Sequence, residues 1–358
     1  MLSPVSLLSI DGPETTILKA AGPIAWLKRV MRVNHAEAVI SGFAMTDGKV
    51  DRTTFDNSGP GGLRLQAGLV TNCIIRNNDG SDNSGGVEIS GGLLTSSTII
   101  DNRAWRGNNA NAGRGGGIGV FGGTVRDCVI ANNQANLNGG GVRQTGGLIE
   151  HCQITENISG LAGKTDHHGG GFYQTGGKAR ACTIVDNTAY GIGGGAYLTG
   201  GALQSSLVVS NNASTATGNG HGIYLEGASA RLENVTVADN SPDITGNGLY
   251  MLNGTVTNAI VYFNGTSDLN QTGGSIGYSC WSEAVADNGN INDNPAFLNR
   301  AEGNYRLSTL SPCINTGINY LWTPADRDLD GNQRIQFTIC DMGAYESLYG
   351  NATLLILR

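Results

Sequence analysis

The chain has 358 residues, among them 56 glycines and only 8 prolines, and its formal net charge is −7. No Gly-X-Y period occurs, which excludes collagen, and 39% hydrophobic against 14% charged residues disfavours disorder. The acidic balance argues against nucleic acid as a partner, and because no run of 18 apolar residues exists we expect no transmembrane helix.

The first part of the chain shows only weak repeats. Residues 1–60 predict short strands broken by glycine and aspartate, with almost no signal for helices. The start lacks a basic stretch and a small-residue cleavage site, so we expect any secretion signal to lie upstream or to have been removed.

One phrase then recurs from about residue 70 to residue 264: three glycines, a four-residue strand, two glycines, and a Cys-x-Ile strand that ends at an asparagine. The aligned asparagines are Asn78, Asn102, Asn133, Asn157, Asn187, Asn212, Asn240 and Asn264. Their separations of 24, 31, 24, 30, 25, 28 and 24 residues indicate a coil of 24 residues with insertions at one turn. Crossovers between parallel strands are right-handed, so we expect an all-β fold, a right-handed parallel β-helix over residues 1–264, with the amides stacked as a ladder.

Each strand after a glycine triplet should point its first and third residues inward. These pairs are Val87/Ile89, Ile118/Val120, Val142/Gln144, Phe172/Gln174, Ala196/Leu198, Ile223/Leu225 and Leu249/Met251. We expect Gln144 and Gln174 to stack as an amide pair between adjacent coils.

The outward positions of the same strands form a column in which four successive coils carry tyrosine. The column consists of Glu88, Gly119, Arg143, Tyr173, Tyr197, Tyr224 and Tyr250. One interpretation is an amphipathic surface on which sugar rings pack, with Glu88 and Arg143 as polar ends. The other is a tyrosine ladder that only stabilises an exposed sheet by cross-strand stacking.

Insertions at the loop-bearing turn, residues 105–114, 163–168 and 217–221, provide a second candidate site. Their ionisable residues include Lys164, Asp166, His167, His168 and His221. They suggest either a transition-metal site or acid–base chemistry that removes a proton next to the carboxylate of a uronate. The catalytic candidates are Arg143, Lys164, His167 and His168. Solvated loop residues without a role are the third interpretation.

The repeated phrase resembles the GGA(I/L/V) and FxxN repeats of polymorphic outer membrane proteins, within the pectate-lyase-like superfamily, with isoleucine in place of phenylalanine. This resemblance implies a parallel β-helix. A polysaccharide lyase of this fold would be expected to carry an acidic cluster for Ca²⁺, or a Lys or Arg base, on the sheet face. The column has one glutamate, one arginine and no pair of aspartates, which disfavours a lyase.

Residues 265–358 lose the repeat and gain aromatic residues and prolines. The stretches NDNPAFLNRAEGNYRLSTLSPCINTG, DRDLDGNQRI and DMGAYES resemble the choice-of-anchor Q region of bacterial surface proteins. We expect a polar cap over the strand edges and core of the last coil. Asp326, Asp328 and Asp330 resemble half of a calcium loop, which predicts either a structural Ca²⁺ or a carboxylate-rich turn.

The seven cysteines divide into two groups. Those at the repeat position, expected as a column of packed inward thiols, are Cys73, Cys128, Cys152 and Cys182. Stacked side chains make poor disulfides, so Cys280 and Cys313 are the better candidate pair, with Cys340 as a competitor for either.

Two functions are compatible with these features. The first is a secreted or bacterial cell-surface protein, monomeric, that binds glycans or other surfaces through the tyrosine column and the long loops, including His221. The second is a polysaccharide lyase or epimerase that acts on an acidic polysaccharide.

Overall fold

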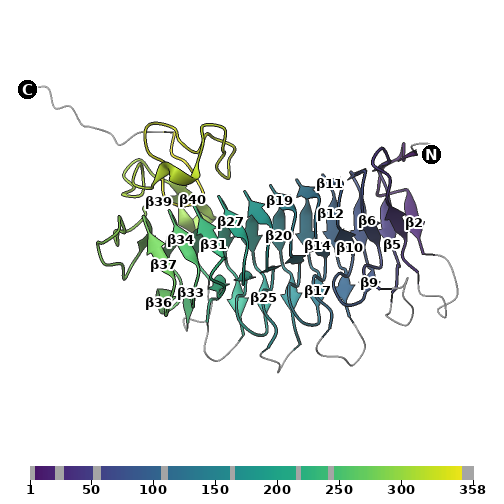
Figure 1. The fold of residues 1–358 in the computed structure, drawn as a ribbon, viewed down its shortest axis with the longest axis horizontal. Helices are drawn as coiled ribbons and strands as arrows, with labels where there is room; N and C mark the ends of the chain where they lie inside the picture. Colours follow the sequence, from purple (N-terminus) through teal and green to yellow (C-terminus); the bar gives the residue numbers. More distant parts are fainter. Residues whose placement is uncertain are drawn as a thin grey trace, which may run out of the picture.

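The computed structural model describes residues 5–20, 28–50, 58–105, 112–161, 166–214, 219–240 and 246–348. Within these ranges the chain forms a right-handed parallel β-helix, as the repeats predict, with three long parallel sheets that run its length (Figure 1). The described part of the chain contains no helix with the length and apolar character that crossing a membrane requires.

We name the sheets by the repeat segment that precedes each strand. The triplet sheet consists of β3 (Met31–Val33), β6 (Leu63–Leu65), β10 (Val87–Ile89), β14 (Ile118–Val120), β18 (Val142–Gln144), β22 (Phe172–Gln174), β26 (Ala196–Leu198), β30 (Ile223–Leu225), β33 (Asn247–Met251) and β36 (Ser267–Gln271). The pair sheet, which follows the two glycines, consists of β1 (Ser6–Leu8), β4 (Val39–Ser41), β7 (Leu69–Thr71), β11 (Leu93–Thr95), β15 (Thr124–Arg126), β19 (Leu148–Glu150), β23 (Lys178–Arg180), β27 (Ala202–Gln204), β31 (Arg231–Glu233), β34 (Thr255–Thr257) and β37 (Ser275–Gly277).

A third long sheet completes the coils, and a small sheet is present in six of them. The cysteine sheet consists of β2 (Ile17–Lys19), β5 (Ala44–Thr46), β8 (Ile74–Arg76), β12 (Thr98–Ile100), β16 (Val129–Ala131), β20 (Gln153–Thr155), β24 (Thr183–Val185), β28 (Leu207–Val209), β32 (Thr236–Ala238), β35 (Ile260–Tyr262) and β38 (Cys280–Trp281). The small sheet, just after the asparagine, consists of β9 (Asp79–Gly80), β13 (Arg103–Ala104), β17 (Gln134–Ala135), β21 (Ile158–Ser159), β25 (Thr188–Ala189) and β29 (Asn212–Ala213).

The core is built from the inward columns that the repeat predicts. Every inner pair of the triplet sheet from Val87/Ile89 to Leu249/Met251 is fully buried. Gln174 donates its amide N–H to Gln144 Oε1 at 2.9 Å, which confirms the amide pair. Side chains alternate between the two faces of a strand, so a slip of one residue would turn the apolar residues outward. The register of these strands is therefore strongly fixed.

The asparagine ladder is present, with one correction. Each ladder amide accepts at Oδ1 from the backbone N–H and Nδ2–H of the asparagine one coil earlier, at 2.9–3.1 Å. The residue between Asn187 and Asn240 is Asn211, whereas Asn212 was expected. Asn212 begins β29 of the small sheet, where it pairs with Thr188.

The glycine triplet is explained by this ladder. Gly139 has φ +68°, which a residue with a side chain rarely adopts. A Cβ on Gly140 would lie 2.3 Å from Gly170 O, and one on Gly141 would lie 2.8 Å from the Asn157 side chain. The three glycines therefore serve a turn, a close approach of two backbones, and room for the ladder amide.

The C-terminal region differs from the expected cap in two respects. Strands β36, β37 and β38 pair in parallel with β33, β34 and β35, so the coils extend beyond residue 264 to Trp281. The remaining residues, 282–348, carry a hairpin of β39 (Phe297–Asn299) and β40 (Asn304–Leu307) and the short 3-10 helices η1 (Arg300–Glu302) and η2 (Asn319–Leu321). They lie against the side of the β-helix, on β28, β32 and β35, rather than only over its end (Figure 1).

This lateral contact is apolar and covers the outer face of the cysteine sheet. Leu207, Val209 and Ala238 pack against Tyr305 and Tyr345 of the C-terminal region. The seven cysteines are all buried free thiols, so the candidate pair Cys280 and Cys313 is not joined in this structure. The four cysteines of the repeat pack in the main core, as expected.

Candidate functional site

The outward column of the triplet sheet lies in register, as expected. Arg143 is paired with Tyr173, Tyr173 with Tyr197, Tyr197 with Tyr224, and Tyr224 with Tyr250. The four phenol rings stack with centroid separations of 5.6, 5.4 and 4.8 Å and interplanar angles of 9, 17 and 7°.

This stacking corrects one expectation for the tyrosine column. Neighbouring rings cover each other's faces, so the column presents ring edges and hydroxyl groups outward. Sugar rings pack on aromatic faces, and those faces are occupied within the column. The surface is therefore suited to hydrogen bonding along a row of hydroxyls rather than to face-on stacking.

The centre of the column is covered by two residues from neighbouring turns. Tyr197 is only 7% exposed, its hydroxyl donates to Glu226, and the His168 ring stacks near it at 4.8 Å. Burial, together with the bond to Glu226, raises the pKa of the Tyr197 hydroxyl. Tyr197 thus remains a protonated donor that is already engaged.

Arg143 stands at the head of the tyrosines, partly buried and next to an aromatic ring. Its guanidinium carbon lies 5.3 Å from the centre of the Phe121 ring. Within the described residues its Nε and Nη1 are buried and find no hydrogen-bond acceptor. Burial, and secondarily the nearby Arg114, lowers the pKa of Arg143, and Tyr173 and Glu88 oppose this shift without cancelling it.

Glu88, two coils before Arg143 in the same column, is paired with another arginine. Glu88 Oε1 lies 2.8 Å from Arg64 Nε in a salt bridge. Gly119 lies between Glu88 and Arg143 in the column. A side chain would not fit at this position, because a Cβ would lie 2.6 Å from Asn83 O of the preceding coil.

The loop histidines have structural roles as partners of backbone N–H groups. His167, His168 and His221 accept at Nδ1 from the backbone N–H groups of Leu161, Ile192 and Ala213, at 3.3, 3.4 and 3.1 Å. A neutral imidazole that accepts at Nδ1 carries its proton on Nε2 and has no free lone pair for a base. Burial also lowers the pKa of His168, so it stays neutral.

The loop cluster therefore differs from the expected metal or acid–base site. His167 and His221 are buried, at 0 and 3% exposure, and neither lies on the tyrosine face as a free ligand. Among the described residues no three His, Cys, Asp or Glu side chains are arranged to hold a metal ion. Lys164 lies outside the described residues.

The three aspartates of the half calcium loop are directed to separate partners. Asp326 accepts from Thr323, and Asp330 pairs with Arg306 at 2.5 Å. Asp328 accepts from the backbone N–H groups of Asn332 and Glu346 at 2.7 and 2.8 Å. The carboxylates do not converge, so this segment is the carboxylate-rich turn and not a calcium site.

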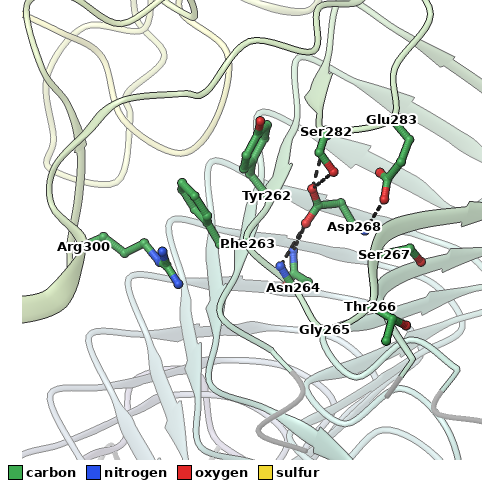
Figure 2. A pocket seen from close by; sticks show the side chains of 10 residues that line it. All are labelled: Tyr262, Phe263, Asn264, Gly265, Thr266, Ser267, Asp268, Ser282, Glu283 and Arg300. Atoms are coloured by element: carbon green, nitrogen blue, oxygen red, sulfur yellow. Dashed lines mark hydrogen bonds between the residues drawn. The ribbon is translucent and has the colours of Figure 1, made fainter. Parts of the chain in front are cut away.

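A polar pocket of about 310 Å³ opens beside the last coil, next to β36 (Figure 2). The Asp268 carboxylate accepts from the backbone and side chain of both Asn264 and Ser282. Arg300, at its edge, is paired with Asp239 at 2.6 Å. The buried carboxylate of this pocket, Asp268, and its arginine, Arg300, therefore already have partners, in contrast to Arg143.

Two residues of the triplet face were not anticipated from the sequence. Glu226 follows its strand where the other coils carry Ser90, Phe121, Thr145, Thr175, Thr199 and Leu252, and a single acid in that column was an available signal. Arg64 precedes the part of the chain where the repeat is legible, and only the register of β6 with β10 reveals it.

No family model and no curated protein sequence matches this chain. Among solved structures it is similar to the crystal structure of pectate lyase Pel9A, with a TM-score of 0.51 at 11% sequence identity, covering 96% of this chain and 80% of that chain. At this identity the likeness shows the fold, a parallel β-helix. The resemblances to polymorphic outer membrane proteins and to choice-of-anchor Q regions stay predictions.

Proposed function

We propose that the protein binds an acidic polysaccharide along the outer face of the triplet sheet, outside the cell or at its surface. The observation that carries the proposal is the guanidinium of Arg143, which is partly buried beside the tyrosines without an acceptor among the described residues. A uronate carboxylate is planar and anionic, and arginine recognises such groups through paired, charge-assisted hydrogen bonds.

The rest of the face suits the hydroxyls of the same polymer. The edges of Tyr173, Tyr224 and Tyr250 lie in one straight line of half-buried phenols beyond Arg143. A phenol both donates and accepts hydrogen bonds, and its partly apolar body retains contact with the sugar. A linear polymer laid across the coils would meet a phenol in the coils of Tyr173, Tyr224 and Tyr250.

Binding is favoured over proton abstraction because the neutral His168 has no lone pair available. The base of an elimination must accept the proton next to the uronate carboxylate, and the Nδ1 lone pair of His168 is directed at Ile192 N–H.

The direct test is equilibrium binding of polygalacturonate, with uncharged dextran as the comparison ligand, measured by calorimetry at low and moderate salt. We expect binding to the acidic polymer only. Arg143→Gln should weaken it about 10-fold to 100-fold, since a charge-assisted hydrogen bond contributes about 1.5–3 kcal/mol. The matched control is Arg231→Gln, an exposed arginine of β31 on the pair sheet, which should bind like the wild type. Equal affinity of Arg143→Gln and wild type would refute the proposal.

A lyase is the second candidate, because the lowered pKa of Arg143 would also suit a base. Incubation with polygalacturonate, with and without added Ca²⁺, should then yield the ultraviolet absorbance of an unsaturated uronate. Product that disappears in Arg143→Gln supports the lyase, and binding without product supports the binding protein.

A further inference from the structure

Two cysteines that are remote in sequence meet where the C-terminal region joins the last coil. Cys280 lies in β38, and Cys313 lies in a turn of the C-terminal region. Both are 0% exposed, and they share an apolar cluster with Ile260, Leu307 and Met342. Interaction with the Cys280 thiol, and secondarily burial, raises the pKa of the Cys313 thiol.

The other thiol pair in contact offers a comparison. Cys128 and Cys152 also interact, but each directly precedes a strand of one parallel ladder, β16 and β20, in the same register. Side chains that project in parallel from neighbouring strands do not meet the geometry of a disulfide. Cys280 and Cys313 belong to segments of different architecture, a strand and a turn, so this restriction does not apply to them.

We propose that Cys280 and Cys313 form a disulfide when the protein folds in the presence of a low-molecular-weight disulfide. The Cys280 thiolate attacks one sulfur of glutathione disulfide and releases one glutathione thiolate, and the Cys313 thiolate then displaces the second glutathione. Two protein thiols are oxidised, one glutathione disulfide is reduced to two glutathiones, and the two protein protons pass through solvent to the leaving thiolates.

The bond would tie residues 282–348 covalently to the end of the coils. The contacts that otherwise hold this region include the ion pair of Arg300 with Asp239 and the hydrogen bond of Arg334 to Ser205. Closing the chain between positions 280 and 313 restricts the unfolded ensemble and stabilises the docked state. Since both sulfurs are buried, the exchange takes place before docking, and the finished bond is shielded from reductants.

The test refolds the full chain with a glutathione redox couple or with excess reductant, followed by alkylation in denaturant and peptide mass mapping. We expect the Cys280–Cys313 linked peptide only in the oxidised sample, a fall from seven titratable thiols to five, and a melting temperature of the C-terminal region higher by roughly 5 °C. Native protein should keep the bond under mild reductant.

Cys313→Ser should abolish the linked peptide and the difference in melting temperature, and Cys340→Ser, a buried thiol of the same region, should retain both. If Cys313→Ser does not fold, the wild-type peptide map decides alone. Seven free thiols after oxidative refolding, or a link between Cys128 and Cys152 in place of the proposed one, would overturn the inference.

Discussion

At the scale of single residues, the amide ladder has a direction. Each asparagine donates towards the C-terminal end and accepts from the N-terminal side. At the first end, Asn78 Oδ1 accepts from Gly48 N–H at 2.9 Å. At the last end, Asn264 donates both its backbone and side-chain N–H groups to Asp268. A carboxylate suits this end because it only accepts and faces the positive end of the aligned amides.

The direction of the ladder predicts that asparagine and aspartate are not interchangeable in it. In Asn157→Asp a carboxylate oxygen would replace Nδ2 and face the carbonyls of Ile130 and Thr155, which now accept at 2.9 and 2.8 Å. A buried charge without a donor costs about 3–5 kcal/mol. In Asp268→Asn an amide donor would face other donors, at a smaller cost of about 1–3 kcal/mol. Denaturant unfolding measures both changes.

The control for this prediction is Asn132→Asp, an exposed residue that adjoins the ladder at φ +52°. Asp101 and Asp186 already occupy the same position in other coils with φ +55°. The exchange should leave the free energy of unfolding within about 0.5 kcal/mol. A loss in Asn132→Asp as large as in Asn157→Asp would show that the ladder does not distinguish the two side chains.

At the scale of elements, the sequence predicts the strands well wherever one face is polar. Strand β18 reads Val-Arg-Gln with its first and third residues buried. The predicted alignment was wrong by one residue at β28, Leu207–Val209. All three residues of this strand are apolar and buried, so the alternation of inward apolar and outward polar residues is lost. The C-terminal region covers the outer face there, and no local pattern reveals a cover that comes from a distant segment.

Contact with the C-terminal region also explains the unusual residue Phe263, which precedes the last ladder asparagine, Asn264. Phe263 has φ +67°, at a position where preceding coils carry aspartate, asparagine, serine or glutamate. A bulky residue is costly in this conformation. The Arg300 guanidinium lies 4.0 Å from the centre of the Phe263 ring while it pairs with Asp239 one coil earlier. The docking of η1 therefore offsets the cost at Phe263.

The C-terminal region also holds two buried acids that predict its response to pH. Burial raises the pKa of Asp341 from 3.8 to about 6 and that of Glu346 from 4.5 to about 8. Arg334 opposes both shifts, and Asp328 adds to that of Asp341. A carboxyl with a raised folded pKa favours the folded state at low pH, and this contribution is lost as the pH rises through the folded value.

We therefore expect the C-terminal region to become less stable between about pH 4 and pH 8. For Asp341 the shift corresponds to about 3 kcal/mol, lost between pH 3.8 and about 6. Thermal unfolding of wild type and Asp341→Asn across this range checks it. The variant loses one acceptor at every pH, so the quantity to compare is the slope of stability against pH. We expect this slope to be flatter in the variant below pH 6. Parallel slopes would contradict the assignment.

At the scale of the whole molecule, the position of the C-terminal region was the part least accessible from the sequence. Residues of DLDGNQRI and DMGAYES, separated in the chain, meet in one buried network. Arg334 donates to Glu346 Oε1 at 2.7 Å, and Glu346 N–H donates to Asp328 at 2.8 Å. The spacing of Asp326, Asp328 and Asp330 suggested calcium because it does not show that the carboxylates have separate partners in space, such as Arg306 for Asp330. Arg334 also donates to Ser205 at 3.1 Å, which fixes this network to the side of the coils.

This arrangement predicts that Arg334 controls the attachment of the C-terminal region and not the β-helix itself. Arg334→Met leaves Glu346 and the carbonyls of Gly343 and Ala344 without their buried donor. An unsatisfied buried acceptor costs about 1–3 kcal/mol, while the parallel ladders remain intact. We expect rapid proteolysis within residues 285–348, retained strand signal in circular dichroism, and faster hydrogen exchange at Val209 and Ala238 on the uncovered face.

The matched control is Arg327→Met, an exposed arginine of the same region that donates only to the carbonyls of Pro324 and Asp326. It should resist protease like the wild type. A repeat protein is stabilised mainly by contacts between neighbouring coils, so detaching a lateral segment should leave the coils folded. A single cooperative loss of all strand signal in Arg334→Met would mean instead that the lateral region is an integral part of the β-helix.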